Sequence, residues 1–193
     1  MKNQKVRTAY HEAGHVVTLY LLTGKIDPIK SVDIITEGSR LGACKSKEDA
    51  YLIEDASVFE TFGVHEYNNW IEYVEYDTVK GFREILDEVC YCLGGGVSEM
   101  LYCGLKRLPR KGMSGDFDSI YILADKMLPI AYDKTGVVYY PALNSMIDTC
   151  LHFLKSLLSN DEASTKIKVI AEALLEHKAL DSNTVLKLLK KTE

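Results

Sequence analysis

The sequence lacks an apolar run long enough to cross a membrane. Its longest apolar stretches, such as Val16 to Leu22, fall far short of the roughly 20 residues that a spanning helix needs. The N-terminus also lacks the charged start, apolar centre and small-residue cleavage site of a secretory signal. We therefore expect a cytoplasmic protein with no membrane span.

Basic stripes and paired cysteines are missing as well. The net charge is -5 and no face collects Lys and Arg, which argues against nucleic acid as the main partner. The five cysteines are an odd number and include no Cys-x-x-Cys pair. This usage favours reduced, mostly buried thiols over a disulfide framework, a metal site or a redox pair.

One long segment, from Glu48 to Val79, contains neither Lys nor Arg. It combines nine acidic residues with seven aromatic ones, the latter being Tyr51, Phe59, Phe62, Tyr67, Trp70, Tyr73 and Tyr76. Such a segment could be a lid or a docking surface for a separate basic or apolar protein partner. The alternative is a solvated flap whose aromatic rings pack on the domain.

Apolar spacing predicts a mainly helical chain. Helices are expected over about 5–22, 80–101, 116–132, 141–158, 162–177 and 181–190, with a purely helical pattern beyond Gly136. One β-hairpin is expected, with strands at 31–36 and 41–44 around a turn at 37–40. The predicted fold class is mainly α with a small β-hairpin (α+β), as a single domain over 1–193. Within it we expect a zincin-like, metal-bearing helical core (1–135, with an acidic insertion at about 48–79) and a helical bundle (136–193).

Three consecutive glycines, Gly94 to Gly96, interrupt the second predicted helix. Each costs a helix about 1 kcal/mol relative to alanine, so some contact should offset the loss. Close approach of a neighbouring helix is the simplest reason. A phosphate-binding loop is the alternative, but no Gly-Lys-Ser/Thr follows.

The first predicted helix carries His11-Glu12-Ala13-Gly14-His15, which matches the H-E-x-x-H pattern. Residues four apart project from one face of a helix, so both imidazoles can bind one ion. Glu12 lies between them, close enough to deprotonate a water that the ion activates. A chain of this length shows the pattern by chance roughly once in a hundred. The motif therefore predicts a Zn²⁺ site with Glu12 as the general base.

A catalytic zinc usually takes a third protein ligand. The extended pattern with a third histidine is excluded, because Leu21 stands where that histidine would be and Thr18 where a glycine is expected. Chemistry alone leaves five candidates for this position: Glu99, Asp116, Asp118, His65 and His152.

Several motifs together resemble the peptidase domain of the FtsH family of AAA+ zinc metalloproteases. The first is Thr8-Ala-Tyr-His-Glu-Ala-Gly-His15 with the hairpin that follows it. Leu93-Gly-Gly-Gly-Val-Ser-Glu99 is similar to the family's second helix, and Ser114-Gly115-Asp116-Phe117 to its aspartate segment. Ile170-Ala-Glu-Ala-Leu-Leu-Glu176 is similar to its C-terminal bundle.

The resemblance implies Asp116 as the third ligand, with Glu99 orienting a ligand histidine from outside. It also implies that the strand residues Leu41, Gly42, Ala43 and Cys44 offer an edge to an extended peptide. Members of the family carry an ATPase module and form rings, so a homo-oligomer is expected. This chain contains no Gly-x-x-x-x-Gly-Lys-Ser/Thr loop, which predicts a stand-alone peptidase that does not itself unfold substrates.

The sequence thus predicts a zinc metalloendopeptidase acting on peptides or unfolded proteins. The alternative is a catalytically weak, peptidase-like binding or regulatory module that retains zinc. A third hypothesis is a helical structural protein in which the motif occurs by chance.

Overall fold

The computed structural model describes residues 3–35, 41–46, 79–109, 112–127, 131–132, 138–139 and 141–192. The predicted turn at 37–40, His65 and nearly all of the acidic segment at 48–79 lie outside these residues. The interpretations of that segment as a lid, docking surface or flap therefore stay predictions.

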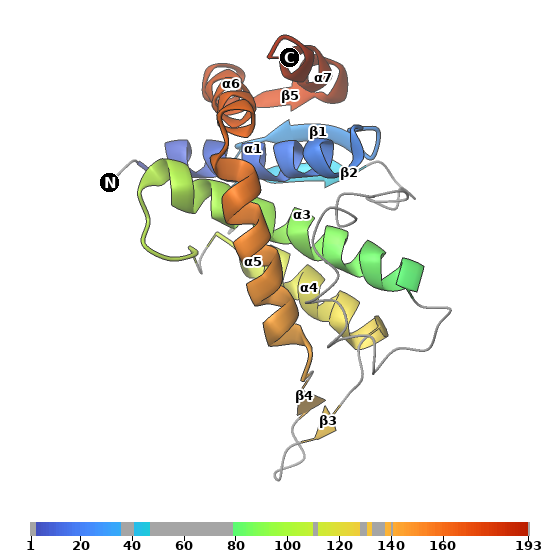
Figure 1. Cartoon of the computed structure of the whole chain (residues 1–193). Helices are drawn as coiled ribbons and strands as arrows, with labels where there is room; N and C mark the ends of the chain where they lie inside the picture. The colour runs from blue at the N-terminus through green and yellow to red at the C-terminus, as the bar shows by residue number, and fades with distance from the viewer. Residues whose placement is uncertain are drawn as a thin grey trace.

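The fold is mainly α with a small sheet, as predicted (Figure 1). Six helices are described: α1 (Gln4–Thr23), α3 (Val79–Cys103), α4 (Ser114–Met127), α5 (Leu143–Ser159), α6 (Asp161–His177) and α7 (Ser182–Lys190). In the part of the chain that the structure describes, no helix combines the length and apolar character needed to cross a membrane.

Local capping sets both ends of α1. The side chain of Asn3 accepts a hydrogen bond from the backbone N–H of Val6, which satisfies one of the free donors at the helix start. Gly24 adopts a left-handed φ of 69°, and its N–H bonds to the carbonyl of Tyr20. The stop predicted at Thr23-Gly24 is confirmed.

The predicted hairpin is present, shifted along the chain and extended by a third strand. Strand β1 (Ile29–Asp33) pairs antiparallel with β2 (Ala43–Ser46), so both strands differ by about two residues from their predicted bounds. Strand β5 (Ala179–Asp181) pairs antiparallel with the other side of β1, giving the order β2-β1-β5. In the described part of the chain, β2 is therefore an edge strand of this sheet.

Two parts of the predicted helical pattern were wrong. Helix α4 ends at Met127 rather than at 132, and β3 (Ala131–Tyr132) pairs with β4 (Val138–Tyr139). The chain beyond Gly136 is thus not purely helical, since β4 and β5 both lie there. Strands β3, β4 and β5 have only two or three residues each, too few for a pattern in the sequence to indicate them.

Helix α1 lies between α3 on one side and α6 with the sheet on the other (Figure 1). Its apolar residues Ala9, Ala13, Val16 and Val17 are fully buried. They belong to one continuous core cluster that also contains residues of α3, α5, α6 and α7. The segments 1–135 and 136–193 therefore share a core.

The glycines of α3 allow this close packing. A Cβ placed on Gly14 of α1 would lie 2.5 Å from the carbonyl oxygen of Gly94, and one on Gly94 would meet Thr18. Close helix approach, rather than a phosphate loop, is thus the confirmed reason for the glycine run. The five cysteines are all free, and all but Cys44 are buried, as predicted.

Candidate metal centre

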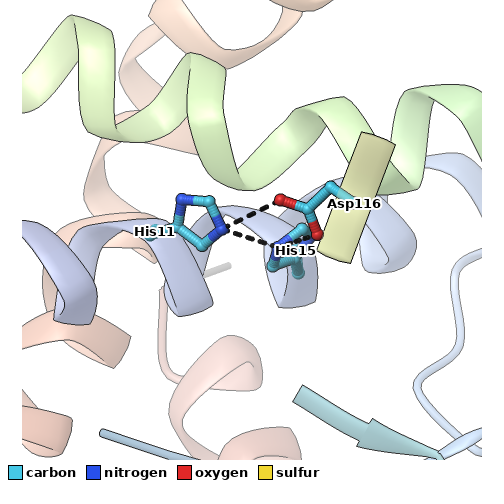
Figure 2. Close-up of side chains that lie close together, drawn as sticks. All are labelled: His11, His15 and Asp116. Carbon is cyan, nitrogen blue, oxygen red and sulfur yellow. Dashed lines mark hydrogen bonds and ion pairs between the residues drawn. The ribbon is translucent and has the colours of Figure 1, made fainter. Parts of the chain in front are cut away.

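Helix α1 brings the two histidines of the motif together. His11 and His15 lie one turn apart, and their Nε2 atoms are 3.1 Å from each other (Figure 2). Both residues are 5% exposed. Their rings meet edge to face, with centroids 4.8 Å apart.

Asp116 comes from the first turn of α4 and points at both rings (Figure 2). One carboxylate oxygen, Oδ2, is 3.2 Å from Nε2 of His11, and the other, Oδ1, is 3.4 Å from Nε2 of His15. The three candidate ligand atoms all lie within 4.8 Å of one another. No other group of three or more His, Cys, Asp or Glu side chains at this spacing occurs among the described residues.

The structure separates the five candidates for the third ligand. Asp116 is the one that joins the two Nε2 atoms. Glu99 lies on the far side of the His11 ring, with Oε2 3.3 Å from Nδ1. Asp118 and His152 are exposed and make no such contact. His65 lies outside the described residues.

The outward nitrogens of both rings have acceptors. Nδ1 of His15 donates to the backbone carbonyl of Tyr91 at 2.9 Å, and Nδ1 of His11 faces the carboxylate of Glu99. An acceptor at Nδ1 keeps the proton on that nitrogen and leaves Nε2 with its lone pair exposed. Each ring is therefore oriented to use Nε2 as a ligand.

Arg7 supports Glu99 from the other side. Its Nε donates to Oε1 of Glu99 at 2.5 Å, and Glu99 is 2% exposed. A buried carboxylate is costly without such a partner. The sequence analysis did not find Arg7, because Arg7 and Glu99 are 92 residues apart along the chain and no local pattern links them.

The residues at this point fit a divalent ion. Two Nε2 lone pairs face each other beside Oδ2 of Asp116, a buried oxygen with no hydrogen-bond partner. Such an arrangement is repulsive unless a cation or a proton lies between the groups. Two imidazoles with one carboxylate form a donor set that zinc prefers, and three protein ligands leave one position open.

The pKa values reflect this crowding. Burial alone would lower the pKa of His11, but the neighbouring carboxylates of Asp116 and Glu99 raise it to about 10. Burial lowers the pKa of His15. Burial would raise the pKa of Asp116, but the neighbouring His15 and His11 hold it below its usual value. In the metal-free protein, one proton on His11 thus takes the place of a cation.

Gly95 lets the α3 backbone pass directly over the two imidazoles. A Cβ at this position would lie 2.8 Å from Nε2 of His11 and would also meet Nε2 of His15. The middle glycine of the run therefore belongs to the site itself, a role that the sequence analysis did not assign to it.

Glu12 is 6% exposed and faces the loop that leads into β2. A Cβ on Gly42 would lie 2.8 Å from Oε1 of Glu12, so the carboxylate and this backbone are in close contact. Both residues line a cavity of about 380 Å³ that also contains His11, His15 and Asp116. The four residues predicted to form the substrate edge, Leu41, Gly42, Ala43 and Cys44, all line this cavity.

Comparison with known proteins gives weak but consistent similarities. The chain is 27% identical over 217 aligned positions to "ATP-dependent zinc metalloprotease FtsH 2" of Methylacidiphilum infernorum, covering 98% of this chain and 29% of the relative. It is 25% identical to "ATP-dependent zinc metalloprotease FtsH" of Borreliella burgdorferi, covering 95% and 24%. It is 26% identical to "Mitochondrial inner membrane m-AAA protease component AFG3L2" of Mus musculus, covering 96% and 22%.

These similarities support a relationship to the FtsH family. No family model matches the chain. The chain spans about a quarter of the length of these curated relatives. Since the names of two of them describe zinc metalloproteases, the relationship supports a protease function at the level of the family.

Proposed function

We propose that this chain is a zinc-dependent metallopeptidase domain that hydrolyses peptide bonds in peptides or unfolded proteins. The observation that carries the proposal is the convergence of two Nε2 atoms and the carboxylate of Asp116, with both histidines oriented by acceptors at Nδ1. His11, His15 and Asp116 would hold the ion, and Glu99 and Arg7 would keep the ring of His11 in place.

Glu12 is suited to move protons in this cavity. Zinc, when bound, supplies the Lewis acidity that polarises a carbonyl and makes a water more acidic. Glu12 would accept the proton of the attacking water and pass it to the leaving amine. Its low exposure and its contact with the loop before β2 hold it beside the backbone that would bind the substrate.

The edge of β2 supports binding of an extended peptide. Among the described residues, strand β2 pairs with β1 on one side only, and its first residues line the cavity beside Glu12. A peptide that adds to this edge would form backbone hydrogen bonds and lay its scissile bond across the metal centre. Folded proteins do not offer such a strand, so the substrates would be peptides or unfolded segments.

Metal analysis and cleavage of unfolded casein test the proposal. We expect about one zinc per chain, held by the donor set above. Replacing Glu12 with Gln should leave the zinc in place and lower turnover by a hundredfold or more, because general acid–base catalysis contributes about 10²–10⁴. His11→Ala should lose both zinc and turnover.

Glu172→Gln is the matched control, since it makes the same change on the exposed face of α6 and should keep full activity. Equal turnover by the unmodified protein and Glu12→Gln would exclude the catalytic role of Glu12. Stoichiometric zinc with no turnover in the unmodified protein would instead favour the zinc-retaining regulatory module.

A further inference from the structure

The cavity at the metal centre carries an excess of negative charge. Among its described lining residues are four carboxylates and no Lys or Arg. Three of the carboxylates have roles already: Glu99 is paired with Arg7, Asp116 faces the two histidines, and Glu12 has an interaction partner of its own. The fourth, Glu88, has none of these partners.

Glu88 lies half-buried on α3. No ion pair joins it to a basic side chain in the described part of the protein. Burial raises its pKa to about 7, and no nearby charge contributes to the shift. A carboxylate that loses water without gaining a cation is unfavourable, and a cation entering the cavity would remove that cost.

The position of Glu88 relates it to a substrate bound at the centre. Glu88, Cys92, Gly95 and Glu99 follow one another at spacings of three or four residues, so they share one face of α3. Gly95 lies at the level of the metal site, because a Cβ added to it would meet Nε2 of both His11 and His15. Glu88 is seven residues earlier, which is about 10 Å along the helix axis. An extended peptide covers that distance in about three residues.

We propose that Glu88 is a specificity residue that binds the ammonium or guanidinium group of a substrate Lys or Arg within about three residues of the scissile bond. This inference rests on the proposed peptidase function. It deepens that function by naming a substrate class: unfolded segments or peptides with a basic residue near the cleavage site.

Pairs of peptides that are identical except for one Lys or Gln test the proposal. The variable residue is moved through the three positions on either side of the cleaved bond, and kcat/KM is measured for each pair. At one or more positions we expect the unmodified protein to prefer Lys by about tenfold, the size of one charge-assisted hydrogen bond. Glu88→Gln should reduce that ratio to within about twofold.

A charge reversal gives the sharper result. Glu88→Lys should reverse the preference at the same position, so that a Glu peptide is cleaved faster than its Lys counterpart. Glu172→Gln, which removes one exposed negative charge from α6, should keep the Lys preference. A Lys preference that survives both Glu88 variants, or one that Glu172→Gln lowers equally, would overturn the proposal in favour of general charge attraction.

The pH dependence of the Lys-to-Gln ratio provides a second readout. The ratio should be largest near pH 8 and should approach one as the pH falls to 6, since protonation removes the charge of Glu88. Because both peptides use the same catalytic groups, a ratio cancels the titration of the other cavity groups. Those groups are His11, Glu12 and His15 of α1, Cys44 of β2, Tyr91, Cys92 and Glu99 of α3, and Asp116 of α4.

Binding separates a failure of this inference from a failure of the peptidase proposal. The same peptides are titrated into the zinc-loaded Glu12→Gln protein and into Glu12→Gln with Glu88→Gln. Tighter binding of Lys peptides that depends on Glu88 supports the inference even if no protein turns over substrate. Equal binding of Lys and Gln peptides to Glu12→Gln would overturn it, whatever the activity.

Discussion

At the scale of single residues, the orientation of each imidazole depends on what its outward nitrogen contacts. The carbonyl of Tyr91 holds His15, and the Arg7–Glu99 pair holds His11. These partners present both Nε2 atoms to the same point. Removing partners of this kind often weakens metal affinity by about 10–100-fold, because they set both the tautomer and the position of the ring.

The proton on His11 predicts how zinc affinity varies with pH. The pKa of His11 is raised to about 10, so the metal-free protein keeps this proton below that pH, and each zinc must displace it. The shifts of His15 and Asp116 are downward, so neither competes at neutral pH. The apparent Kd for zinc should therefore fall about tenfold per pH unit between about pH 6.5 and 9.

Competition with a chromophoric chelator measures this affinity, and calorimetry in buffers of different ionisation enthalpy counts the released proton. An ordinary histidine, with a pKa of 6.5, would give an affinity that levels off above about pH 7.5. A flat profile from pH 7.5 to 9 would therefore contradict the raised pKa.

At the scale of elements, the contact between α1 and α3 decides whether a site forms. Gly14 and Gly94 let the two backbones approach, and Gly95 places α3 directly against the histidines. The three glycines lower the helix propensity of α3 but allow the two helices to cross at close range. The N-terminus of α4 then supplies Asp116 from a third direction.

We expect Gly95→Ala to disrupt this crossing at the metal centre. The new methyl group would meet Nε2 of both histidines, so zinc affinity should fall at least tenfold. Overpacking of this kind also costs about 1–3 kcal/mol of unfolding free energy. Urea unfolding and zinc competition measure the two effects.

Gly115→Ala is the matched control beside Asp116. A Cβ there meets nothing within 4 Å, and alanine favours the helix by up to about 1 kcal/mol. We expect normal zinc affinity and equal or higher stability. Gly95→Ala binding zinc as tightly as Gly115→Ala would show that α3 does not constrain the histidines.

At the scale of the whole molecule, one core joins the part that carries the candidate metal centre to the C-terminal helices. Helix α1 contacts both α3 and α6, and β5 pairs with β1, whose other side holds β2. The strand that lines the cavity therefore depends on a segment near residue 180. This sharing favours one cooperative unfolding unit.

Zinc removal should lower the temperature of that single transition. At free zinc of 1,000 times Kd, binding stabilises the folded state by about 4.1 kcal/mol. For a chain of this size, that corresponds to roughly 10 °C in Tm. Calorimetry with zinc and with a chelator measures the shift, and His15→Ala should show none. Two separate transitions, only one of them zinc-dependent, would contradict a single cooperative unit.

Features that depend on neighbours along the chain could be predicted from the sequence. Examples are the His11/His15 pair on one helix face and the stop of α1 at Gly24. Helices α5, α6 and α7 could be predicted for the same reason, because apolar periodicity and capping act within a few residues. Resemblance to a family, rather than pattern, was needed to choose Asp116 among five candidates.

What the sequence by itself determined is therefore the chemistry of the motif and the helices, since a helical turn sets its own side-chain geometry. Only the tertiary structure decided which groups meet that motif, namely Asp116, the Arg7–Glu99 pair and the backbone of Gly95. It also decided that Glu88 lines the same cavity. These contacts join residues about 80 to 105 positions apart, and the residues paired between β5 and β1 are still further apart along the chain. No local pattern records such contacts, because they follow from how the helices and the sheet pack.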